Sequence, residues 1–148
     1  VISDMKFESV CLSVGTHQCD IAMAGLTINE ERKEQVTFSD PYYSAQQKLI
    51  VPSDNTEFDA CKTKDDVEAI LNKKDDSCKI GVQSGTTADF FLTDEIELEG
   101  GSLYNTNTKK HDFDSLDAAI MDIGLNIDYV IIDAAPAERI TESINEMR

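Results

Sequence analysis

The sequence predicts an α/β protein, because segments of helical and strand character alternate along most of its 148 residues. Such alternation builds a sheet whose parallel strands are joined by right-handed crossovers. The segment Tyr129–Asp133 reads YVIID, a nearly continuous apolar strand that is typical of a parallel sheet covered on both faces. A hydrophobic content of 41% is sufficient for the core of one medium domain or of parts of two.

The first part of the chain predicts two short helices with a strand between them. Residues 6–14 have apolar side chains at helical spacing, and Gly15 ends that helix. Residues 20–24 form an apolar strand. Asn29 is expected to cap a helix that runs to Gln35, because the acidic residues of its first turn suit the helix dipole.

The middle and the end of the chain continue the alternation. Residues 47–51 predict a strand that Pro52 ends, and the polar residues 53–62 predict a loop. Thr63 and Asp66 form a capping box, with Asp in place of Glu, at the start of the next helix. Later elements are expected at the strand Lys79–Gln83, a helix carrying Phe90, Phe91 and Leu92, a short strand at 103–106, a helix at 113–123, and a last helix with Pro136 in its first turn.

Acidic residues outnumber basic residues by 29 to 13, which gives a net charge of −16. Residues 1–50 carry 7 acids and 4 bases (−3), whereas residues 51–148 carry 22 and 9 (−13). The negative field of such a surface repels nucleic acid and anionic membranes, although an excess of acidic residues is also ordinary on a soluble protein. No apolar run approaches the roughly 20 residues that span a bilayer.

The four cysteines contain no C-x-x-C spacing, which disfavours a zinc or thioredoxin-like motif. Cys61 and Cys78 bracket a predicted helix and could be bridged, and Cys11 and Cys19 could meet between a helix and the next strand. Sequence alone leaves three pairings open, and free buried thiols are the alternative.

The run AGLTINEERKEQVTFSDPYY at residues 24–43 carries the first candidate site. Gly25 lets a ligand approach the backbone closely, because it has no Cβ. Thr27 offers a hydroxyl, and Arg32 can hold a carboxylate through two parallel hydrogen bonds. The alternative for Arg32 is a surface arginine paired with a neighbouring acidic residue.

Two further polar clusters are expected at the carboxyl ends of strands, where ligands of open α/β sheets bind. The turn at residues 84–87 joins a strand to a helix, and amides at such a helix start favour an anion. Asp133 ends an apolar strand and is either the cap of the next helix or a partner for a cation. Two anion-binding clusters and one acid together match the zwitterion of an α-amino acid. No nucleophile–base arrangement, P-loop or metal-ligand spacing is present.

At these residues the chain resembles the amino-acid-binding proteins of ABC importers, the family 3 solute-binding proteins with the type II periplasmic fold. The matching segments, in the family's order, are DIAMAGLTINEERKEQVTFSDPYY at 20–43, IGVQSGTT at 80–87 and DYVIIDAAPA at 128–137. The resemblance implies a three-layer α/β/α architecture of two lobes around a cleft. Residues 1–46 would be the middle part of lobe 1 with a first hinge strand at 44–46, and residues 47–148 most of lobe 2.

The resemblance also implies roles for particular residues. Gly25, Thr27 and Arg32 would bind the α-carboxylate from the first lobe, and Thr87, through its backbone N–H, would bind it from the second together with Thr86. Asp133 would bind the α-amino group. The position of Gln83 often touches the ligand side chain in this family.

Relative to the family the chain lacks segments at both ends, so lobe 1 is incomplete and one wall of the cleft is missing. We therefore expect a processed or excised piece of a longer protein, whose precursor has a signal peptide. Uncovered sheet edges and apolar surface invite pairing, so the isolated piece is expected to form a homo-oligomer or to exchange strands.

The function implied is the extracytoplasmic substrate-binding component of an amino-acid ABC transporter, in the periplasm or on a Gram-positive cell surface as a lipoprotein. Its partners would be a free amino acid and the importer's permease, with no nucleic acid, cofactor, metal or catalysis. The alternatives are the ligand-binding sensor domain of a membrane receptor, and a periplasmic dehydratase of the same fold. A dehydratase needs a general acid over its substrate, and only Asp133 offers an acid there.

Overall fold

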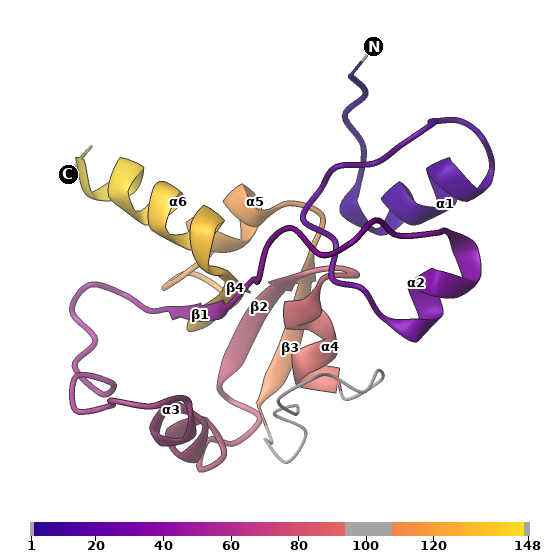
Figure 1. Ribbon diagram of the computed structural model, residues 1–148. Coiled ribbons are helices and arrows are strands. Elements are labelled where there is room, and N and C mark those ends of the chain that lie inside the picture. The colour runs from indigo at the N-terminus through magenta and orange to yellow at the C-terminus, as the bar shows by residue number, and fades with distance from the viewer. Residues whose placement is uncertain (1, 94–107, 147–148) are drawn as a thin grey trace.

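The computed structural model describes residues 2–93 and 108–146, and Figure 1 shows the course of the chain. One four-stranded sheet has the order β1–β4–β2–β3, with β1 at Gln47–Ile50, β2 at Lys79–Gln83, β3 at Lys109–Phe113 and β4 at Tyr129–Asp133. Strand β2 runs parallel to both of its neighbours, and β1 runs antiparallel to β4. The predicted α/β fold is thus confirmed, with one antiparallel strand at an edge.

Helices cover both faces of this sheet in a three-layer arrangement (Figure 1). The helices concerned are α3 (Lys64–Leu71) and α4 (Thr87–Thr93) on one face, and α5 (Leu116–Met121) and α6 (Ala134–Glu146) on the other. Side chains of β4 alternate between the two cores, with Tyr129 and Ile131 in the first and Val130 and Ile132 in the second. A strand buried on both faces must be apolar throughout, which is why YVIID predicted β4 with its correct bounds.

Three short helices precede the sheet in the chain. They are the 3-10 helix η1 (Phe7–Ser9), α1 (Val10–Gly15) and α2 (Glu30–Gln35). The helix predicted at 6–14 therefore exists but begins as a 3-10 turn. The predicted cap of α2 is confirmed, because the Asn29 Oδ1 accepts a hydrogen bond of 2.9 Å from the Arg32 N–H.

The strand predicted at residues 20–24 is wrong. This segment has no regular structure, and its apolar side chains Ile21 and Met23 are 76% and 82% exposed. A strand is stabilised by a ladder with a neighbour, and the segment has no such neighbour among the described residues.

Strand β3 was not predicted, because Lys109–Phe113 reads KKHDF and lacks apolar alternation. It forms through its backbone, pairing in parallel with β2 at the edge of the sheet. The predicted helix at 113–123 is consequently shorter, and α5 begins after the Ser115 cap. The strand predicted at 103–106 lies outside the described residues.

The predicted capping box of α3 is confirmed. The Thr63 Oγ1 accepts from the Asp66 N–H at 3.3 Å, and Asp66 Oδ2 accepts from the backbone N–H groups of Lys62 and Thr63, each at 3.0 Å. These bonds, first that of Lys62 and then those of Thr63, lower the pKa of the Asp66 carboxyl.

The capping box makes stability depend on pH. Because the folded pKa of Asp66 lies below its unfolded value of about 3.9, its contribution is complete above that value and is lost as the pH falls through the folded pKa. We expect Asp66→Asn to lower the urea unfolding midpoint near neutral pH and to have a smaller effect at about pH 2. Asp65→Asn in the same turn is the control, and an equal loss at both pH values would contradict this assignment.

All four cysteines are free thiols, so neither of the two pairings considered from sequence is present. Burial, reinforced by the Asp128 charge, raises the pKa of the Cys78 thiol to about 11. No helix in the described part of the chain is both long and apolar enough to cross a membrane.

Candidate functional site

Arg32 is the centre of the candidate site. It lies in α2 with only 7% of its surface exposed, so the alternative of a surface arginine is wrong. Its Nη1 donates to the Thr27 carbonyl at 2.7 Å and its Nη2 donates to the Gly85 carbonyl at 2.8 Å. The guanidinium thus ties the segment that carries Thr27 to the turn that follows β2.

Two aromatic rings flank this guanidinium. The Arg32 Cζ lies 5.7 Å from the ring centroid of Phe7 and 5.7 Å from that of Phe90, distances typical of cation–π contacts. Burial lowers the pKa of Arg32 below its usual value, while the charges of Cys11, Glu31 and Asp133 act in the opposite direction. Sequence reasoning missed both rings, because neither lies within helical spacing of Arg32.

Thr27 and Thr87 meet directly. Their hydroxyl oxygens are 2.7 Å apart, and either group can be the donor. Together with the contact between Arg32 and Gly85, this bond brings the first two sequence clusters to one place. Gly25, in the same segment, has φ +61°, a conformation that L side chains rarely adopt, and a Cβ would meet nothing within 4 Å.

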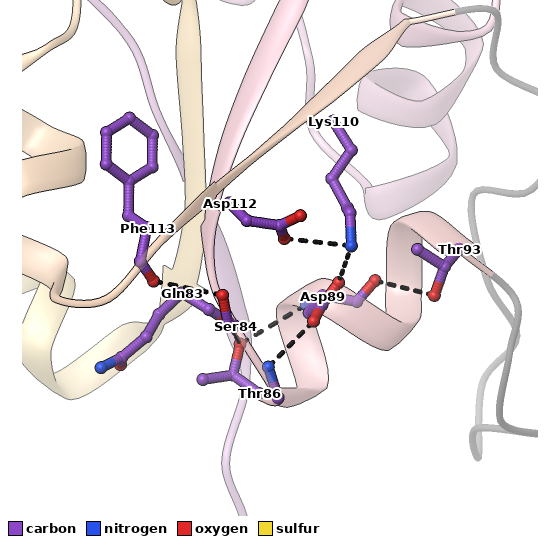
Figure 2. Close-up of polar contacts among 9 residues, drawn as sticks. Gln83, Ser84, Thr86, Asp89, Thr93, Lys110, Asp112 and Phe113 are labelled. Atoms are coloured by element: carbon purple, nitrogen blue, oxygen red, sulfur yellow. Dashed lines mark hydrogen bonds and ion pairs between the residues drawn. The ribbon is translucent and has the colours of Figure 1, made fainter. Parts of the chain in front are cut away.

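The Thr86 hydroxyl is engaged within the turn itself (Figure 2), whereas the Gln83 side chain bonds a residue outside it. The Thr86 Oγ1 donates to the Gln83 carbonyl at 2.7 Å and accepts from the Asp89 N–H at 3.4 Å, so this hydroxyl caps α4. The Gln83 side chain donates to the Asp114 carbonyl at 3.2 Å. Thr87, at the first position of α4, has a backbone N–H that no intrahelical carbonyl can satisfy.

Asp133 ends β4 opposite Gln47 of β1, and its Oδ1 accepts a hydrogen bond from the Gln47 Nε2. The Gln47 Oε1 is buried and has no hydrogen-bond partner among the described residues. Helix α6 begins directly after Asp133, but Pro136 at its third position has no N–H that could donate to the Asp133 carboxylate as a cap. The Asp133 side chain is therefore directed to β1, a pairing for which the sequence contains no signal.

A cleft of about 1110 Å³ adjoins these residues. Gly25, Thr27, Gln47 and Thr87 line it, whereas Arg32, Gln83 and Asp133 do not. Much of its remaining wall is apolar, from Leu49, Val51, Val67, Leu71, Phe91 and Ile131. No group of His, Cys, Asp and Glu that could hold a metal ion occurs in residues 2–93 and 108–146.

Two relatives show what the chain is similar to in sequence. It is 36% identical over 89 residues to an arginine-binding periplasmic protein of Mannheimia haemolytica, a match covering 60% of this chain and 30% of that protein. It is 28% identical over 130 residues to a probable histidine-binding protein of Neisseria gonorrhoeae, covering 87% and 42%.

A crystal structure shows the same likeness in three dimensions. A mutant of ArgBP from T. maritima superposes with a TM-score of 0.75 at 30% sequence identity, covering 97% of this chain and 54% of that one. The chain thus spans about half, or less, of the length of these relatives. The family model for bacterial extracellular solute-binding proteins, family 3, matches residues 1–123. The chain therefore belongs to the bacterial extracellular solute-binding proteins of family 3.

Proposed function

We propose that this protein is the extracytoplasmic substrate-binding component of an amino-acid ABC transporter, and that it binds a free α-amino acid by closing two lobes around it. The observation that carries the proposal is the meeting of Thr27 and Arg32 with Gly85 and Thr87. It joins a hydroxyl, a guanidinium and a strand-to-helix turn at one point. Residues 1–46 would belong to lobe 1, with the hinge at 44–46, and residues 47–148 would supply most of lobe 2.

We assign the α-carboxylate to Arg32, Thr27 and Gly25 on one side and to Thr87 and Thr86 on the other. A guanidinium has five N–H donors, and among residues 2–93 and 108–146 two of those of Arg32 donate to carbonyls, so donors remain for a carboxylate. A carboxylate oxygen that accepts from both threonine hydroxyls needs them roughly 5 Å apart, since each such bond is about 2.7 Å long. The hydroxyls are now 2.7 Å apart, so the ligand must enter an arrangement more open than this one.

We assign the α-ammonium group to Asp133, whose second carboxylate oxygen is not used by Gln47. The unpartnered Oε1 of Gln47 lies beside it as a further acceptor. We keep Gln83 as the candidate contact for the ligand side chain, by analogy with its position in the family; in the present arrangement its side chain donates to the Asp114 carbonyl. An ammonium group has three donors and is best held by several oxygens, which this pair of residues supplies.

L-Arginine is the first ligand to test, because one relative and one similar structure are named as arginine-binding proteins. The net charge of −16 also favours a cationic ligand during encounter. We place the protein in the periplasm, or on a Gram-positive cell surface as a lipoprotein, with the importer's permease as its partner. The relatives reported above are named as binding proteins, which favours binding over dehydration.

The proposal is tested by isothermal calorimetry of the full-length protein with the twenty L-amino acids. We expect saturable binding of at least one of them, and Thr27→Val should weaken it about tenfold, because the variant keeps the shape but loses one hydrogen bond to a charged group. The exposed Thr56→Val is the matched control. Absence of binding by any amino acid to the folded wild-type protein would refute the proposal.

A further inference from the structure

Asp89 in the first turn of α4 is one of the few charged residues in the described part of the chain that is buried, with 8% of its surface exposed. Its two carboxylate oxygens have different partners. Oδ1 accepts from the Lys110 Nζ at 2.6 Å, and Oδ2 accepts from the Gly85 N–H at 2.9 Å. Figure 2 shows the Lys110 ammonium group between the carboxylates of Asp112 and Asp89.

Lys110 reaches this position from β3, the polar edge strand. Its Nζ also lies 3.0 Å from the Asp112 Oδ1, and 29% of its side chain is exposed. Burial acts to lower the pKa of Lys110, but the hydrogen bonds of Asp89 and Asp112 outweigh it and raise the pKa above its ordinary value. The lysine is therefore charged at neutral pH, and it binds the carboxylate oxygen of Asp89 that Gly85 does not use.

Gly85 connects this ion pair to Arg32. Its N–H donates to Asp89 while its carbonyl accepts from the Arg32 Nη2 at 2.8 Å. Its φ is +72°, and an added Cβ would lie 3.1 Å from the Glu8 Cβ, so a residue with a side chain would be strained at this position. The Gly85 N–H and carbonyl belong to the two peptide planes that meet at its Cα, so the bond to Asp89 holds one plane and the bond to Arg32 holds the other.

We propose that the Asp89–Lys110 ion pair positions Arg32 through the Gly85 backbone, and thereby sets the geometry with which the α-carboxylate of an amino acid is held. The inference rests on the function proposed above. Asp89 and Lys110 touch no ligand in this scheme and act only as positioning residues.

A helix cap alone does not explain this arrangement. In a capping box the acidic side chain accepts from the backbone N–H of the cap residue itself, which here is Thr86. The Thr86 N–H instead donates to the Gln83 carbonyl at 3.3 Å, and Asp89 accepts from the residue before. A cap also needs no half-buried lysine from a strand, whereas a carboxylate whose direction must be fixed does.

The test uses Asp89→Asn and Lys110→Met in the full-length protein, with the exposed neighbour Lys109→Met as the matched control. Calorimetry with L-arginine and L-argininamide measures whether the carboxylate is still preferred over the amide. We expect Asp89→Asn and Lys110→Met each to lower the affinity for L-arginine about tenfold, to affect L-argininamide less, and so to reduce the ratio of the two affinities. If Asp89→Asn does not fold, Lys110→Met decides the result.

A second readout needs no ligand. NMR hydrogen exchange of the Arg32 guanidinium should be slow in the wild-type protein and in Lys109→Met, and faster in Asp89→Asn and Lys110→Met. Lower melting temperatures with unchanged exchange and an unchanged affinity ratio would overturn the inference, because they would show a purely structural ion pair. If the wild-type protein binds none of the twenty amino acids, the proposed function is refuted, and the exchange rates then decide whether this pair positions Arg32; if it binds one other than L-arginine, that amino acid and its amide are used in the same comparison.

Discussion

Replacing Arg32 with alanine is expected to abolish amino-acid binding by the full-length protein. The guanidinium is the only buried cation of the candidate site in the described part of the chain, and an unpaired carboxylate in a cleft shielded from water costs roughly 2–5 kcal/mol. Calorimetry of the folded variant with L-arginine and with the other amino acids measures the loss.

The structure also predicts which contacts contribute to this loss of affinity. Alanine releases the carbonyls of Thr27 and Gly85, so part of the effect comes from loosening the contact between the two segments. Arg32→Lys keeps the charge but cannot reach both carbonyls with one planar group, and it should bind with intermediate affinity. Exposed Arg139→Ala in α6 is the control and should bind as the wild type does. Unchanged affinity of the folded Arg32→Ala variant would contradict the assignment of the ligand α-carboxylate to Arg32.

Asp133→Asn is expected to weaken the binding of ligands that carry a free α-amino group and to leave the binding of their deaminated analogues unchanged. The substitution keeps the shape and leaves an oxygen for Gln47, but it removes the charge that faces an ammonium group. Hydrogen bonds to charged groups contribute about 1.5–3 kcal/mol, so a loss of roughly ten- to a hundredfold in affinity is expected. Calorimetry with an amino acid and with the corresponding deaminated acid measures the difference.

The control for this variant is Asp117→Asn, an exposed acid in the first turn of α5. Gln47→Leu is a useful companion, because it removes the hydrogen bond to Asp133 together with the unpartnered Oε1 and leaves the charge in place. An equal loss for amino and deaminated ligands in Asp133→Asn would mean that this residue supports the fold and not the ligand.

Local signals predicted a large part of the fold. The caps Asn29 and Thr63 bond their own helices within three residues, so their roles are written in the adjacent sequence. Strand β4 is recognisable because burial on both faces demands apolar residues at every position. The predictions for residues 20–24 and for β3 were wrong for the same reason: a strand forms only where a neighbouring strand offers a hydrogen-bond ladder.

The candidate site shows the same division between local and distant information. Thr87 and Asp133 could be selected by residue type and by their position at a helix start and a strand end, and Thr27 and Arg32 by residue type and their place in the run at 24–43. Their contacts could not, because the Thr27–Thr87 bond spans 60 residues and the bond between Gln47 and Asp133 spans 86. Asp89 and Lys110 were missed because neither stands in a motif, and only the parallel pairing of β2 with β3 brings them together.

The antiparallel pairing of β1 with β4 has a mechanical consequence. Gln47 pairs with Asp133, and the Ala134 N–H donates to the Gln46 carbonyl at 2.7 Å, so Asp133 is hydrogen-bonded next to the residues proposed as the hinge. Strand β2 lies two strands from β1, roughly 10 Å away, and Thr87 follows the end of β2. Rotation about residues 44–46 would then displace Asp133 by a short distance and Thr87 by a longer one. In the proposed mechanism the ammonium group of an amino acid would therefore bind first at Asp133, which moves little. Its carboxylate would then bind at Thr87, which moves more, and would stabilise the closed arrangement.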